Sequence, residues 1–416
     1  MRVVRLLIAC LLGLAFCGLL VTAEEKITIR FLHSVRAPLS EHVEELADDF
    51  MAENDHIAVV TEYGGHFGDV ELKVRTGIAA GHPPTVAHLY DFSIPSIISD
   101  LVPLSEYISD EIEDIIPGLL RSVTSKGVVY GIPWSRSVMI LFYRKDLIKK
   151  PPATWQEFFD LAAELTVDLD GDGQIDRWGT VLRPSDTGIF LNFLHQASGA
   201  LFDEDWLGVT VDDEKGFQAM SHLASLIPYA LIGDNYESTY LEEDLICMFV
   251  SSSSGARFNE QAAEKLGVEL GYAPAPTNEA TGRSGTLSQG GNLVVLRSGQ
   301  TEDQRQAGIE FVRFMMQPEN LASFCIHGGY VPTTEAALAD ESWVDACAKD
   351  DAMTVMTEEI KSAFSLLGHP KYDEIHTTLR SHLEGFIAGG SLFKEEGDVK
   401  HVLGDLAEDL SWFLKE

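Results

Sequence analysis

The sequence predicts an α/β protein of two lobes. Strand-like and helix-like segments alternate between residues 27 and 90, and a second such region begins near residue 136. Setting aside residues 1–23 leaves 393 of the 416 residues, which are enough for two or three domains with full-sized cores. Alternation of this kind favours mostly parallel, doubly wound sheets, whose ligands bind beyond the carboxyl ends of the strands.

The first lobe begins with a strand over residues 27–31, where apolar and polar side chains alternate. A helix follows, and its apolar positions have the spacing i, i+3, i+4 and i+7: Val43, Leu46, Ala47 and Phe50. A second strand over 57–63, a helix over 69–80 and a third strand over 85–90 complete the order βαβαβ.

The second lobe is predicted from a continuous apolar run over residues 138–143, as expected for a strand buried on both faces. Thr154 and Glu157 then form a capping box that starts a helix. Another strand over 287–296 precedes a helix that Pro318 ends. The remainder of the chain, from about residue 335, is expected to be mainly helical.

The first 23 residues are typical of a signal peptide, because two arginines precede an uncharged apolar run over residues 6–21. Small residues before Glu24 suit signal peptidase, so a periplasmic or other extracytoplasmic location is expected. Lipid anchoring is the alternative. It would use Cys10 or Cys17, neither of which lies in a good lipidation motif.

The formal net charge of −35 argues against a nucleic-acid partner, which requires clustered Lys and Arg. No later segment has eighteen uncharged apolar residues, as a membrane-spanning helix would need. Three cysteines follow the signal peptide. They allow at most one disulfide, between Cys325 and Cys347, or three buried thiols that include Cys247.

Several ordered motifs carry a resemblance to a known family. They are Phe31-Leu32-His33-Ser34, Gly131-Ile132-Pro133-Trp134, Leu141-Phe142-Tyr143-Arg144-Lys145-Asp146, Pro152-Ala153-Thr154-Trp155-Gln156-Glu157, Ser253-Ser254-Gly255, Gly290-Gly291, Phe314-Met315-Met316-Gln317-Pro318-Glu319-Asn320 and Gly329-Tyr330-Val331-Pro332-Thr333-Thr334. With these motifs in this order, the chain resembles the family 1 extracellular solute-binding proteins. Within that family it is most similar to the glycerol-3-phosphate- and sugar-binding branch.

The resemblance implies a type II periplasmic-binding-protein fold, in which hinge strands join two discontinuous lobes. We expect one lobe from residues 24–135 and 288–335 and the other from 136–287 and 336–416. The implied function is the substrate-binding component of an ABC importer, which closes on a ligand and delivers it to the permease. A monomer is expected.

The resemblance also implies ligand contacts at eight positions, all in the cleft between the lobes: Phe67, Asp91, Trp134, Ser137, Ser254, Gly290, Tyr330 and His376. Several have ordinary alternatives, since Asp91 could cap a helix and Gly290 could allow two strands to approach closely. Arg136 could bind an anion or be an exposed hinge residue paired with an acid.

One departure from the branch concerns phosphate. His376 occupies the position of the branch's phosphate-binding arginine, and tryptophans expected between residues 179 and 199 are missing. A sugar, polyol or oligosaccharide is therefore the expected ligand. Glycerol-3-phosphate or a glycerophosphodiester is the alternative.

A separate acidic loop matches four ligand positions of a calcium loop, with Asp168, Asp170, Asp172 and Asp176. Gly179 stands where a bidentate Glu belongs, so the loop predicts either a structural calcium site or a metal-free acidic turn. No other cofactor is expected.

An enzyme is not expected, because the sequence contains no nucleophile elbow, phosphate loop or zinc motif.

Overall fold

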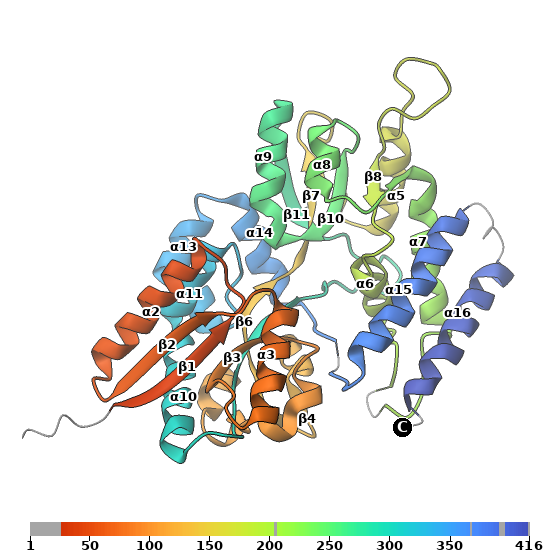
Figure 1. Cartoon of the computed structure of the whole chain (residues 1–416). Coiled ribbons are helices and arrows are strands. Elements are labelled where there is room, and N and C mark those ends of the chain that lie inside the picture. The colour runs from red at the N-terminus through yellow and green to blue at the C-terminus, as the bar shows by residue number, and fades with distance from the viewer. Residues whose placement is uncertain (1–25, 204–205, 367, 391–395, 415–416) are drawn as a thin grey trace, which may run out of the picture.

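Two separate sheets organise the chain, as Figure 1 shows. The computed structural model describes residues 26–203, 206–366, 368–390 and 396–414. The predicted signal peptide, with Cys10 and Cys17, lies outside the described residues.

The first sheet has the strand order β2-β1-β3-β12-β6. Strands β1 (Ile27–His33), β2 (Ile57–Tyr63) and β3 (Val86–Tyr90) are parallel, which confirms the predicted alternation. Strand β12 (Gln289–Val295) is inserted antiparallel between β3 and β6 (Ile132–Ser137). The sheet is therefore mixed, because a strand from much later in the sequence returns to it.

Four long helices cover this first sheet: α2 (Leu39–Glu53), α3 (Phe67–Ala80), α10 (Glu302–Met315) and α11 (Pro318–Gly328). The buried residues of α2 are the four apolar positions that the sequence predicts. Smaller elements are α4 (Ser109–Glu113), β4 (Thr124–Ser125), β5 (Val128–Val129), α12 (Glu335–Leu338) and α13 (Glu341–Cys347). Helices α12 and α13 pack against α11.

The second sheet is centred on β7 (Met139–Arg144), which pairs antiparallel with β10 (Met248–Ser252) and β11 (Leu270–Pro274). Two short parallel strands, β8 (Thr180–Leu182) and β9 (Ala230–Ile232), pair with each other beside β10. The Met248 amide of β10 donates to the Gly179 carbonyl, just before β8, at 3.1 Å. Met139 and Leu141 belong to one buried cluster, Ile140 and Phe142 to the other, so β7 is buried on both faces as predicted.

Helices surround the second sheet on both faces: α5 (Trp155–Leu165), α6 (Gly188–Gln196), α7 (Glu214–Leu226), α8 (Glu237–Glu242), α9 (Ala256–Leu266), α14 (Asp351–Ile360), α15 (Tyr372–Gly389) and α16 (Glu396–Ser411). In Figure 1, α15 and α16 lie side by side next to α7. None of the helices in the described part of the chain is long and apolar enough to cross a membrane.

The two lobes are joined where β6 continues into β7 and where the chain returns from β11 to β12. The second connection pairs with residues 364–365: the Phe364 amide donates to the Thr286 carbonyl at 3.1 Å, and the Ser288 amide to the Phe364 carbonyl at 2.8 Å. The lobe boundaries given by the sequence stay predictions. The three cysteines of the described chain are free thiols.

Candidate functional site between the lobes

The eight predicted site residues divide into a buried group and a group near the junction of the lobes. Asp91 and Trp134 are 2 % and 0 % exposed, whereas Ser254 is exposed and Phe67, Ser137, Tyr330 and His376 are half-buried. Burial decides which of them a ligand can reach in this conformation.

Asp91 is held by a buried network at the end of β3. The Arg136 guanidinium donates to both carboxylate oxygens, at 2.6 and 2.7 Å. The Ser122 hydroxyl donates to Asp91 at 2.6 Å, and the Asn292 amide at 3.2 Å. The sequence predicts an acid partner for Arg136, and this pairing is found. The predicted exposure is wrong, because Arg136 is 0 % exposed.

Trp134 and Gly290 also serve contacts within the protein. The Trp134 ring stacks on Phe324 with centroids 3.8 Å apart, and its edge meets His88 at 5.0 Å. A Cβ atom at Gly290 would lie 2.0 Å from the Ser135 carbonyl oxygen. The glycine is therefore required by the close approach of β6 and β12, one of its two predicted roles.

An aromatic row runs from Phe67 to His376 and connects the two lobes. Phe67 at the start of α3 contacts Tyr90 at 5.0 Å between centroids, and Tyr90 contacts Phe92 at 4.9 Å. Phe92 stacks on Tyr372 of α15 at 3.3 Å and 6°. The Tyr372 ring lies 5.8 Å from His376. Two predicted residues thus mark the ends of this row.

The sequence interpretation missed the middle of the row. Tyr90 and Phe92 flank Asp91, and Tyr372 precedes His376 by four residues, which places both on one face of α15. The spacing from His376 was therefore a signal that could have identified Tyr372.

Hydroxyl groups gather where β6 meets the second lobe. The Ser137 hydroxyl donates to the Gln289 carbonyl at 3.4 Å. Its neighbour Val138 exchanges hydrogen bonds with Ser253, through the Val138 carbonyl at 2.8 Å and the Ser253 hydroxyl at 3.2 Å. Ser254 follows, and its hydroxyl lies 2.9 Å from that of Ser252. The structure thus joins the chain neighbours of Ser137 and Ser254 by hydrogen bonds.

Tyr330 lies on the α11 side of this junction. Its ring stacks on Phe324 at 5.7 Å, and burial raises the pKa of its hydroxyl.

Two acids of the second lobe, Asp186 and Glu237, line one pocket, and the charge of Asp186 acts on Tyr90 and His376 of the row. Burial raises the pKa of Glu237, whose carboxylate lies 3.6 Å from Arg183, and the charge of Asp186 raises it further. The Asp186 carboxylate accepts the Gly188 amide at the start of α6, at 2.8 Å. Burial also lowers the pKa of His376, with a smaller contribution from Arg380, so that its imidazole is neutral near pH 7.

His376 is fixed by a hydrogen-bond partner as well: its Nε2 atom lies 3.2 Å from the Thr187 hydroxyl. A neutral imidazole, two carboxylates and several hydroxyls beside aromatic rings can bind hydroxyl groups and the C–H faces of a sugar.

The acidic loop lies apart from this site. Asp168, Asp170 and Asp176 can offer carboxylate oxygens that lie within 4.8 Å of one another. Backbone amides of Gly173 and Gly171 donate to Asp168 and lower its pKa. Calcium binding by this loop, with or without Asp172, stays a prediction.

The fold defines a two-lobed α/β protein of the type II periplasmic-binding-protein class. A sequence profile of the bacterial extracellular solute-binding proteins matches residues 45–352, and the chain belongs to this family. It is a solute-binding protein of the kind that serves ABC importers, and its family is extracytoplasmic.

Known relatives agree with this assignment. The sn-glycerol-3-phosphate-binding periplasmic protein UgpB of Escherichia coli (strain K12) is 26 % identical over 356 residues, which cover 79 % of this chain and 78 % of that protein.

Solved structures show the same fold. The cyclic alpha-maltosyl-1,6-maltose binding protein of Arthrobacter globiformis has a TM-score of 0.81 at 17 % identity, covering 94 % of this chain and 99 % of that one. UgpB of Mycobacterium tuberculosis in complex with glycerophosphocholine has a TM-score of 0.74 at 19 % identity, covering 93 % and 98 %.

Proposed function

We propose that the protein binds a neutral sugar, polyol or oligosaccharide between its lobes and delivers it to the permease of an ABC importer. The observation that carries this proposal is the aromatic row, in which Phe92 of the first lobe stacks on Tyr372 of the second. The facing sides of these two rings cover each other at 3.3 Å, so a ligand that stacks on the remaining faces of the row contacts both lobes at once. It therefore favours the closed arrangement of the lobes over the open one.

A neutral ligand is favoured because three of the bases near the row, Arg136, Arg183 and His376, are either engaged or uncharged. Arg136 is bonded to Asp91, and Arg183 lies 3.6 Å from Glu237 with its guanidinium 5.1 Å above the Tyr236 ring. His376 is neutral near pH 7 because its pKa is lowered. Buried carboxylates accept sugar hydroxyls well but repel a phosphate.

The proposed role is that of a receptor and not of an enzyme. The protein acts as an exported monomer, without nucleic acid, after removal of residues 1–23, and other subunits of the importer hydrolyse ATP.

A phosphorylated ligand is the second candidate, and the similarity to the glycerol-3-phosphate-binding relative favours it. Glycerol-3-phosphate or a glycerophosphodiester would then need a base that replaces the arginine expected at His376.

A thermal-shift screen tests the proposal, because a ligand that binds only the folded state raises the melting temperature. The exported protein is tested against neutral mono- and oligosaccharides, polyols, glycerol-3-phosphate and glycerophosphocholine. We expect a shift of several degrees with at least one neutral saccharide or polyol. A shift with the phosphorylated compounds alone would support the second candidate, and titration calorimetry on each positive compound gives its Kd.

A further inference from the structure

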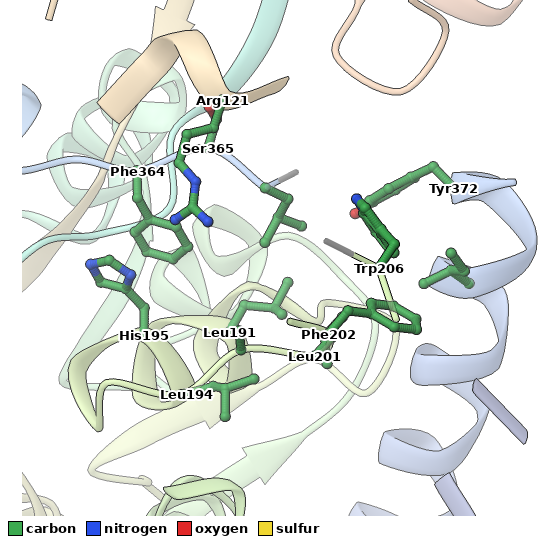
Figure 2. A pocket seen from close by; sticks show the side chains of 14 residues that line it. Arg121, Leu191, Leu194, His195, Leu201, Phe202, Trp206, Phe364, Ser365 and Tyr372 are labelled. Carbon is green, nitrogen blue, oxygen red and sulfur yellow. The ribbon is translucent and has the colours of Figure 1, made fainter. Parts of the chain in front are cut away.

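A second, mostly apolar pocket lies between the lobes beside Arg121. Figure 2 shows the Arg121 side chain directed into it from the first lobe. Its volume is about 70 Å³, several times the roughly 10–15 Å³ that one water needs. The walls are large apolar and aromatic side chains from α6, the segment after it, residues 364–366 and α15: Leu191, Leu194, Phe202, Trp206, Phe364 and Tyr372.

Arg121 is the feature that gives this pocket a chemical preference. It is half-buried in a short turn of 3-10 helix, η3 (Pro117–Ser122). Among the described residues, its guanidinium has neither an acid partner nor a hydrogen bond. In a chain with 65 acidic and 30 basic residues, an arginine without an acid partner is a notable arrangement. A guanidinium presents a planar fork of donors that suits a carboxylate or a phosphate.

His195, a second titratable base in the pocket wall, does not oppose an anion. His195 stacks on Phe364 with centroids 3.7 Å apart. Burial, together with the charges of Arg283 and Arg121, lowers the pKa of His195 to about 4. His195 is thus neutral near pH 7, and the field around it is positive.

The pocket is fixed in shape by hydrogen bonds between the two segments that frame Arg121 and Phe364. The Ser365 amide donates to the Gly118 carbonyl at 2.9 Å, and the Ser365 hydroxyl donates to the Gly118 and Leu119 carbonyls at 3.0 and 3.1 Å. A Cβ atom at Gly118 would lie 2.0 Å from the Ala363 carbonyl oxygen, so the two segments are in close contact. The backbone segment that carries Arg121 is therefore held in place before any ligand binds.

We propose that this pocket is a second binding site for a small amphipathic anion, with its carboxylate or phosphate on Arg121 and a short alkyl or single-ring body against the apolar walls. The site shares only Tyr372 with the aromatic row, and it does not depend on which solute binds there. Because Arg121 belongs to the first lobe and most of the walls to the second, its occupant also contacts both lobes.

Titration calorimetry on the exported protein tests the proposal with four probes. Benzoate and phenyl phosphate carry both an anion and a ring, benzyl alcohol carries only the ring, and inorganic phosphate carries only the anion. We expect benzoate or phenyl phosphate to bind at least about tenfold more tightly than either partial probe, since the charge-assisted pair and the apolar contact add. The better of the two anionic probes identifies the preferred group.

Three variants locate the binding. Arg121→Met is expected to weaken binding of the anionic probe at least about tenfold. Arg121→Lys should weaken it less, because lysine keeps the charge but not the planar fork. Ala200→Trp places a large ring at an exposed position of the pocket wall and should block the probe. Lys150→Met removes the same charge at a side chain that is 83 % exposed, and should leave binding unchanged.

The proposal is overturned if benzyl alcohol binds as well as benzoate, if no probe binds, or if both Arg121→Met and Ala200→Trp leave binding unchanged in folded protein. It is also overturned if the solute found by the thermal-shift screen competes directly with the anionic probe, since Arg121 would then belong to the first site. Failure of the saccharide screen with intact benzoate binding would reject only the proposed function.

Discussion

Arg136 and Arg121 lie fifteen residues apart near the junction of the lobes, yet their surroundings differ. Arg136 is fully buried, and its guanidinium donates to Asp91 and to the Asn292 side-chain oxygen at 2.6 Å. Arg121 is half-buried against apolar walls without an acid. An arginine near the junction of the lobes is therefore not free to bind a ligand merely because of its position. An arginine surrounded by acceptors holds the fold, whereas one without them can bind an external anion.

The largest expected effect is the loss of stability in Asp91→Asn. This variant leaves the Arg136 charge buried without its counter-charge. Breaking a buried pair in this way costs about 3–5 kcal/mol of unfolding free energy. Urea unfolding measures the loss.

Arg121→Met is the matched comparison, since it removes an arginine with no internal partner. We expect its unfolding free energy to stay within about 0.5 kcal/mol of the original protein. Equal losses in the two variants would mean that Arg121 also stabilises the fold, and the distinction between the two regions would disappear.

The next effect concerns the buried acid Glu359. No basic side chain is among the groups that shift its pKa. It is 5 % exposed and accepts a hydrogen bond from the Thr286 hydroxyl at 3.1 Å. Burial raises its pKa from 4.5 to about 7. Asp91 and Glu359 are thus two buried carboxylates, one with a counter-charge and one without.

The sign of the resulting pH dependence follows from proton uptake. Between pH 4.5 and about 7 the folded state holds a proton that the unfolded state has lost, so the unfolding free energy falls as pH rises through this window. Glu359→Gln is expected to flatten this dependence and to be more stable than the original protein at pH 8, by up to about 2–3 kcal/mol. Melting temperatures of the two proteins at pH 5.5, 7 and 8 measure the pH dependence and the difference in stability at pH 8. Parallel curves for the two proteins would contradict the assignment.

Much of the fold could be predicted, because local patterns specify it. The period of apolar residues gives α2, and the uninterrupted apolar run gives the doubly buried β7. The insertion of β12 between β3 and β6 could not be predicted. It depends on pairing between segments about 150 to 210 residues apart, which no local pattern records.

The candidate site shows the same limit. Asp91 and Arg136 were both recognised as possible ligand groups, but their mutual bond joins two strands and is invisible along the chain. Trp134 is covered by Phe324, which lies 190 residues later. Arg121 carries no motif at all. Arg121 differs from Arg136 because no acid pairs with it, and the tertiary structure alone determines this difference.

Tyr372 belongs to both regions, because it stacks on Phe92 and also lines the Arg121 pocket. Tyr372→Ala should weaken binding of the solute found in the thermal-shift screen about tenfold, roughly 1.4 kcal/mol. It should also weaken binding of the anionic probe. Arg121→Met should affect only the probe. Tyr107→Ala, at a tyrosine that is 41 % exposed, is the control. Titration calorimetry separates these cases, and a Tyr372→Ala variant with intact solute affinity would remove the aromatic row from the binding site.

The smallest expected effect concerns acids without any base, in the loop over residues 168–176. Carboxylate oxygens of Asp168, Asp170 and Asp176 can approach one another within 4.8 Å, whereas the twelfth position of the loop is Gly179 and supplies no carboxylate. A site that lacks this ligand should bind calcium weakly. With free calcium equal to Kd, the gain in unfolding free energy is only about 0.4 kcal/mol.

Melting temperatures in millimolar calcium and in EDTA test this loop, with Asp170→Asn as the variant and Asp212→Asn as an exposed acid outside it. We expect calcium to raise the melting temperature of the original protein and of Asp212→Asn, but not of Asp170→Asn. An equal response of all three to calcium would assign the effect to general screening of the net charge of −35. No response in any of them would leave the loop as an acidic turn held by its own backbone amides, as the hydrogen bonds to Asp168 already allow.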